Sequence, residues 1–176
     1  MTEQTAQTEF LQSPSQTIGP MYGFALYERG MNLAVDPSDP AARHIRGRVL
    51  DGDGEPLAHP DALVEVWHGE QFARARTDPF GVWEVWVRKP EGPQTLPDGT
   101  AIATYLHVTV WARGLMKQAE SRLYFPEDTT AHADDPVLAA VPERRRHTLV
   151  PTVEADGTLR FDIHLQGENE TVFFDF

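Results

Sequence analysis

The residues best suited to chemistry lie in one stretch, Thr104 to Phe125, which reads TYLHVTVWARGLMKQAESRLYF. Two β-like halves flank a turn at Ala112-Arg113-Gly114. In the first half, alternation of strand side chains places Leu106, Val108 and Val110 on an apolar core face. The same alternation places Tyr105, His107, Thr109 and Trp111 on the opposite face. An imidazole, a hydroxyl and a guanidinium near a strand end make this stretch the first candidate site.

Arg113 is the residue of this stretch with the clearest candidate role. It follows an aromatic strand and precedes Gly114, so it is predicted at a strand end, where loops build binding sites. A guanidinium there can hold a carboxylate through two parallel hydrogen bonds. On spacing alone, an exposed turn arginine with no ligand is the simpler interpretation.

The seven histidines do not form a metal-binding pattern, because no two of them are separated by two or four positions. His107 and His164 are predicted in strands, where a hydrogen-bonded structural histidine is the simpler interpretation. A self-sufficient metalloenzyme that uses His107 and His164 remains one hypothesis, which metal analysis of the isolated chain would test.

The elements that position these residues are predicted to be short strands. Runs at 44–50, 63–67, 72–77, 82–87, 104–125, 147–153 and 158–165 are separated by turn sequences. Residues 126–142 are expected to hold a helical turn or two, since Pro136 and Pro142 interrupt a longer helix. The last residues are expected to form a short apolar strand. The fold class predicted is all-β, a two-sheet β-sandwich of short strands with an N-terminal arm and little helix.

The chain is expected to form a single domain over residues 1–176, with residues 1–14 flexible and residues 15–42 forming the N-terminal arm. The turn Asp51-Gly52-Asp53-Gly54 also resembles the start of a calcium loop. It lacks the later acidic ligands of such a loop, so a hairpin turn is favoured.

Composition narrows the function classes. The formal net charge of −12 disfavours nucleic-acid binding, and the run Arg144-Arg145-Arg146 is predicted to be a solvated turn or a local ion pair. The chain has no cysteine, which excludes disulfides and thiolate chemistry. The polar N-terminus does not resemble a signal peptide, and no apolar run approaches the roughly 20 residues of a membrane span. A cytoplasmic location is therefore expected.

Four stretches resemble the intradiol ring-cleavage dioxygenases, and among them the alpha-type subunits. They are SQTIGP (15–20), LVEVWH (63–68), HVTVWARG with SRLYF (107–114 and 121–125) and RFDIHLQGENETVFFDF (160–176). In this family Fe(III) is held by two Tyr and two His, the His pair forming His-x-His on one strand. By that resemblance His107 matches the first His, whereas Thr109 stands at the second position. The segment after Trp67 and the loop 89–103 contain no Tyr to complete the set.

The resemblance therefore implies no iron and no catalytic residue on this chain. It implies a homologous beta subunit that carries the Fe(III), in a higher hetero-oligomer of alpha–beta pairs. Thr17, Gly19 and Pro20 would line the beta subunit's substrate pocket, and Arg113 would reach toward the substrate carboxylate. Met21 stands where relatives tend to carry an aromatic residue, and Tyr22 follows one position later.

The implied reaction is oxidative cleavage of 3,4-dihydroxybenzoate (protocatechuate) by dioxygen to 3-carboxy-cis,cis-muconate, in the beta-ketoadipate route of aromatic catabolism. The alternative of another class is a β-sandwich binding module for small molecules, with no enzymatic partner. The state of the isolated chain separates the two, since a site-completing subunit has an apolar partner-facing surface and a carrier is a stable monomer.

Overall fold

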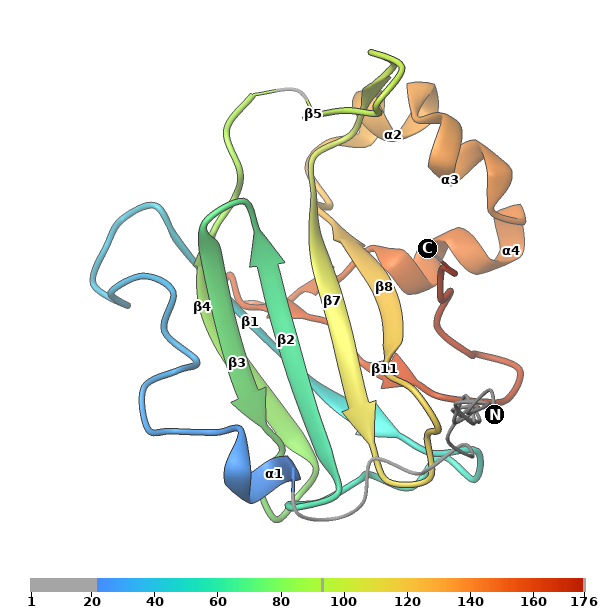
Figure 1. The fold of residues 1–176 in the computed structure, drawn as a ribbon. Coiled ribbons are helices and arrows are strands. Elements are labelled where there is room, and N and C mark those ends of the chain that lie inside the picture. Colours follow the sequence, from blue (N-terminus) through green and yellow to red (C-terminus); the bar gives the residue numbers. More distant parts are fainter. Residues whose placement is uncertain (1–21, 93, 176) are drawn as a thin grey trace, which may run out of the picture.

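The computed structural model describes residues 22–92 and 94–175, in which two β-sheets pack face to face (Figure 1). The four-stranded sheet has the order β3-β2-β7-β8 and is antiparallel throughout. Its strands are β2 (Ala62–His68), β3 (Gln71–Arg76), β7 (Tyr105–Ala112) and β8 (Ala119–Tyr124). The prediction of an all-β sandwich is confirmed.

The second sheet is built around β1, which pairs with β4 on one side and with β10 and β11 on the other. Its strands are β1 (Ala42–Leu50), β4 (Val82–Arg88), β9 (Thr152–Val153), β10 (Leu159–Arg160) and β11 (Ile163–His164). A separate small ribbon joins β5 (Gln94–Thr95) to β6 (Ala101–Ile102). The described part of the arm contains α1 (Tyr22–Ala25) and pairs with β4 through a bridge between Leu33 and Trp86.

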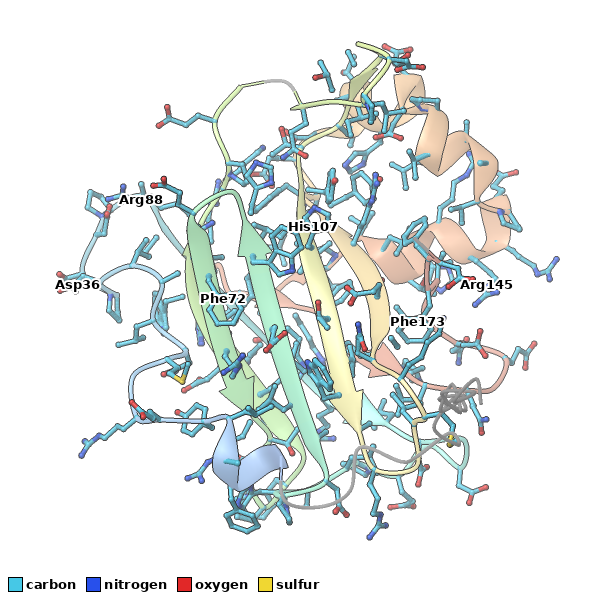
Figure 2. The ribbon with its side chains drawn as sticks, in the orientation of Figure 1. Asp36, Phe72, Arg88, His107, Arg145 and Phe173 are labelled. Carbon is cyan, nitrogen blue, oxygen red and sulfur yellow. The ribbon has the colours of Figure 1, made fainter. Side chains whose placement is uncertain are left out.

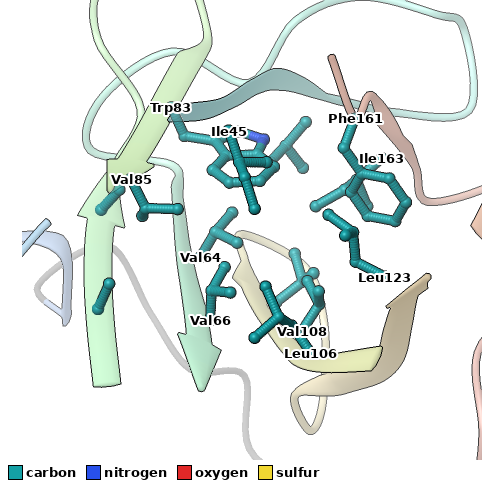
Figure 3. Packing of buried hydrophobic residues seen from close by; sticks show 14 of the residues in the cluster. Ile45, Val64, Val66, Trp83, Val85, Leu106, Val108, Leu123, Phe161 and Ile163 are labelled. Carbon is teal, nitrogen blue, oxygen red and sulfur yellow. The ribbon is translucent and has the colours of Figure 1, made fainter. Parts of the chain in front are cut away.

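The main core fills the space between the two sheets (Figure 3). From the four-stranded sheet Val64, Val66, Leu106 and Val108 point inward, and all four are fully buried. From the opposite sheet the inward residues include Ile45, Trp83, Val85, Phe161 and Ile163. The apolar face predicted for 104–111 from side-chain alternation is therefore the face that lies in the core. The alternation also places the side chains at the other positions of β7 on the outward face of the sheet.

Short helices beyond β8 cover one end of the outward face of the four-stranded sheet (Figure 1). They are α2 (Thr129–Asp134), α3 (Pro136–Ala140), α4 (Glu143–Arg146) and a 3-10 helix (His147–Leu149). Leu138, Val141 and Leu149 pack there against Tyr105 and Tyr124, forming a second apolar cluster. This layer turns the polar face of β7 and β8 into a partly buried environment at that end.

Asp135 fixes the helical layer to the sheet. Its buried carboxylate accepts hydrogen bonds from the backbone N–H groups of Val137 and Leu138 at the start of α3, at 2.7 and 2.9 Å. It also accepts from the N–H of Ala103, just before β7, at 2.8 Å. A carboxylate at this position satisfies amide groups that a helix start leaves without partners.

Two charged patterns in the sequence have local structural roles. Asp51 Oδ1 accepts from the N–H groups of Asp53 and Glu55, both at 2.9 Å, so this carboxylate closes the hairpin turn considered above as a calcium loop. In the arginine run, Arg145 pairs with Glu170 at 3.0 Å and Arg146 donates to the carbonyl of Val141 at 2.9 Å. The run therefore lies in the short helix α4 rather than in a turn, and its ion pair is with Glu170, 25 residues further along the chain.

Three strand predictions were wrong in extent. The start of 147–153 forms the 3-10 helix, and only Thr152–Val153 is a strand. The run 158–165 divides into β10 and β11, because the Asp162 carboxylate, rather than a backbone carbonyl, accepts from the N–H of Arg48 at 3.0 Å. In the described part of the tail, Phe174 forms one isolated bridge to Glu120 instead of a strand.

None of the helices in the described residues has the length and apolar character needed to cross a membrane.

Candidate functional site

The structure separates the predicted site residues along β7. His107 lies near the beginning of the strand, opposite Trp67, whereas Arg113 follows its last residue, Ala112. Six residues of extended chain span roughly 20 Å, so the two side chains cannot act on one small ligand. The expectation that the His, the Thr and the Arg meet at one strand end is therefore wrong for His107, and Arg113 forms a separate candidate site.

Arg113 is held at its backbone and exposed at its side chain. Its N–H donates to the carbonyl of Asp61 at 2.8 Å, which fixes the turn against the chain leading into β2. The guanidinium lies 3.1 Å from Asp61 Oδ2, yet the side chain is 65 % exposed. An exposed ion pair of this kind contributes little energy, so the guanidinium can exchange it for another carboxylate at small cost. Gly114, at φ +92°, lets the chain turn directly after it.

Thr17, Gly19 and Pro20, the other predicted substrate-contacting residues, lie outside the described residues. So does the side chain of Tyr22.

A groove of about 790 Å³ lies over the outward face of the four-stranded sheet. Trp67, His107 and Thr109 line it from the sheet, and Phe173 and Phe174 line it from the tail. Figure 2 shows His107 on β7 and Phe173 on the C-terminal tail, on the other side of β8. The loop from Leu115 to Gln118, which follows Arg113, forms part of the rim.

His107 is held as a neutral ring in this groove. It stacks on Trp67 with ring centroids 3.9 Å apart and an interplanar angle of 7°, and its Nε2 lies 3.2 Å from Tyr105 Oη. The pKa of His107 is lowered to about 4. Burial is the largest cause, and the nearby charge of Arg122 and the His68 ring act in the same direction. The imidazole is therefore uncharged at neutral pH.

Thr109 is engaged with the neighbouring strand. Its hydroxyl donates to Glu120 Oε2 at 2.8 Å, and the two residues are directly paired between β7 and β8. A hydroxyl that donates to a carboxylate in this way is a cross-strand stabilising contact. It is a poor position from which to bind a metal ion.

Arg122 and Tyr124 are the residues here that sequence reasoning missed. The guanidinium carbon of Arg122 lies 4.1 Å over the ring of Tyr105, and its Nη1 donates to Tyr124 Oη at 3.3 Å. Burial raises the pKa of Tyr124 to about 12, while the Arg122 hydrogen bond acts in the opposite direction. The sequence feature that could have identified them is the alternation in SRLYF, which places Arg122 and Tyr124 on the face away from the core.

The residues around His107 do not fit the ferric ligand set of the family that the chain resembles. The Tyr105 hydroxyl lies against His107 Nε2, and the Tyr124 hydroxyl accepts from Arg122. A guanidinium therefore lies among the phenols, and Thr109 is committed to Glu120. Among the described residues, no group of three or more His, Cys, Asp or Glu side chains is placed to share a metal ion.

Comparisons with known proteins agree over nearly the whole chain. The protocatechuate 3,4-dioxygenase alpha chain of Pseudomonas putida is 34 % identical, across 94 % of this chain and 96 % of that protein. The protein of the same name from Burkholderia cepacia is 32 % identical, across 96 % of this chain and 99 % of that protein. No protein-family model matches the chain.

Among solved structures, catechol 1,2-dioxygenase from Pseudomonas arvilla C-1 is similar in fold, with a TM-score of 0.56 at 22 % identity. The match covers 77 % of this chain but 55 % of that longer one. This likeness concerns the sandwich, whereas the two alpha-chain relatives match 94 % and 96 % of this chain.

Proposed function

We propose that this chain, which belongs to the family of protocatechuate 3,4-dioxygenase alpha chains, completes the substrate pocket of an iron-bearing beta subunit. The observation that carries the proposal is Arg113, an exposed guanidinium on a turn whose backbone is anchored to Asp61. The disagreement between the residues around His107 and a ferric ligand set supports placing Fe(III) on the partner. Thr17, Gly19 and Pro20 are proposed, from the resemblance alone, to line the same pocket.

The proposed reaction is the intradiol cleavage of protocatechuate. The bond between the two hydroxyl-bearing ring carbons breaks, and each atom of dioxygen enters one of the two new carboxyl groups of 3-carboxy-cis,cis-muconate. Fe(III), when bound in the beta subunit, supplies activation of the catechol ring toward dioxygen. This chain supplies recognition of the third substituent, the ring carboxylate.

Arg113 is suited to that recognition by chemistry and by position. A guanidinium forms two parallel charge-assisted hydrogen bonds with a carboxylate, which fixes the orientation of the ring as well as its affinity. Asp61, 3.1 Å away, orients the side chain in the absence of substrate. Loss of one such contact costs about 1.5–3 kcal/mol, which corresponds to about tenfold or more in affinity.

The test is kinetic, on the complex of this chain with its beta partner. Arg113→Ala is expected to raise KM for protocatechuate about tenfold or more, and Arg113→Lys is expected to recover only part of the loss. Arg144→Ala removes another exposed arginine as a matched control and should leave KM unchanged. Catechol, which lacks the carboxylate, should be cleaved equally well by wild type and Arg113→Ala.

Unchanged KM for protocatechuate, or an equal loss with catechol, would remove Arg113 from substrate recognition. Assembly is tested separately, since the chain should co-purify with a beta subunit expressed beside it. A stable monomer with no affinity for that subunit would contradict the proposal and revive the carrier hypothesis, which the comparisons give no reason to favour.

A further inference from the structure

Arg122 is a buried cation on β8. Its residue is only 5 % exposed, and it is paired across the strands with His107. The guanidinium carbon lies 4.1 Å over the ring of Tyr105 and 5.3 Å over that of Phe174. Burying a charge is costly unless the surroundings compensate for it, and here aromatic faces and a phenol oxygen do so. A buried guanidinium is uncommon enough to ask what its charge does at this position.

The side chains around Arg122 are of the kinds that bind metal ions. Tyr105, His107 and Tyr124 contribute two phenols and an imidazole, with Tyr105 Oη 3.2 Å from His107 Nε2. Tyr124 Oη is 3.3 Å from the guanidinium nitrogen. His68 and His132 lie near this group, with ring centroids 6.3 Å from Tyr105 and 5.7 Å from Tyr124 respectively.

The charges around Tyr105, His107 and Tyr124 determine whether a metal ion can bind there. The phenol of Tyr124 is protonated and the ring of His107 is neutral at neutral pH, so neither contributes charge of its own. The nearby buried carboxylate of Asp135 accepts three backbone N–H bonds from Ala103, Val137 and Leu138. A metal ion would add two or three positive charges within a few ångströms of a guanidinium in a poorly solvated environment.

We propose that Arg122 is an internal cation that occupies the metal-accessible position among Tyr105, His107 and Tyr124, and that its charge keeps this chain closed to metal ions. Metal exclusion inside this chain does not require a role for Arg113 in a partner's pocket, and the experiment below does not measure catalysis.

The experiment uses the isolated full-length chain and two probes, Co²⁺ and Fe(III) supplied as its nitrilotriacetate complex. Arg122→Gln removes the charge, and Arg122→Lys keeps it and serves as the matched control. Equilibrium dialysis with metal analysis gives stoichiometry and affinity, and visible absorption reports tyrosinate–Fe(III) bonding. Arg122→Gln is expected to bind Co²⁺ at least tenfold more tightly than wild type, at one ion per chain. Arg122→Lys is expected to behave as wild type.

A second substitution ties any uptake to this position, since Arg122→Gln combined with His107→Ala should lose the gained affinity. Equal affinity in wild type and Arg122→Gln would overturn the proposal. A gain in both the Gln and the Lys variants would also overturn it, because loosened packing rather than charge would then be the cause.

If Arg122→Gln does not fold, Arg122→Met supplies a neutral side chain of similar length. The wild-type chain provides an independent check. Stoichiometric Co²⁺ binding that shifts the NMR signals of His107 in wild type would overturn the inference without any variant.

Discussion

His107 should make the stability of this protein depend on pH in the mildly acidic range. Protonation of the ring would place a charge between Trp67 and Tyr105, in a half-buried environment that already contains Arg122. The folded-state pKa is therefore lowered to about 4 from an ordinary value of 6.5. Between these two values the unfolded chain binds the proton and the folded chain does not. The contribution of His107 to stability is thus complete above about pH 6.5 and is lost as the pH falls toward 4.

The size of the effect follows from the two pKa values. At about pH 5 they correspond to a loss of about 2 kcal/mol in the free energy of unfolding. Because water still reaches part of the ring, screening reduces this figure, and roughly 1–2 kcal/mol is expected.

The assay compares urea unfolding of wild type and His107→Gln at about pH 7.5 and about pH 5. Glutamine cannot titrate, so the free energy of unfolding of wild type should fall by roughly 1–2 kcal/mol more than that of the variant. His59, His68 and His132 also have pKa values lowered mainly by burial, but they are present in both proteins and their effects cancel. Parallel pH dependences in the two proteins, or an NMR titration of His107 near 6.5, would refute the reasoning.

Two further substitutions test the scaffold by chemical denaturation. Asp135→Ala should lower the free energy of unfolding by about 2–4 kcal/mol, because three backbone N–H groups lose their acceptor, whereas Asp135→Asn should cost less because it keeps an oxygen. Gly47→Ala should cost about 3 kcal/mol or more, because a Cβ at this position would lie 1.8 Å from the carbonyl oxygen of Phe161. Gly52→Ala is the control for the glycine, since its Cβ would meet the end of the flexible Gln166 side chain; equal costs at the two glycines would contradict the steric argument.

The sequence predicts the sandwich well because side-chain alternation is a local property. Val64 and Val66 alternate with Glu65, and Leu106 and Val108 alternate with His107. The sequence of each strand therefore indicates by itself which face is buried. The same reasoning fails for 158–165, where the pattern continues through a break. That break depends on the Asp162 carboxylate reaching Arg48, a residue more than a hundred positions away in sequence.

The environment of His107 could not be predicted, because it depends on cross-strand register. Alternation places His107 and Arg122 on one face, but only the β7–β8 pairing puts them directly opposite each other. That register depends on the conformation of the loop 113–118 and on the tail, where Phe174 bridges to Glu120. A shift of two residues would keep every side chain on its own face and still separate the guanidinium from Tyr105.

Arg113, just after β7, and His107, within it, lie far enough apart for the end of the strand and its interior to have different roles. A strand of this length is rigid along its axis, and its turn and its interior positions face different surroundings. Arg113 is exposed and free to exchange partners, which suits contact with a second chain. His107 is half-buried and stacked on Trp67, and Arg122 is a buried cation packed over the ring of Tyr105, which suits a position that disfavours metal ions. Substitutions at Arg113 should therefore alter recognition without altering metal uptake, and substitutions at Arg122 should do the reverse.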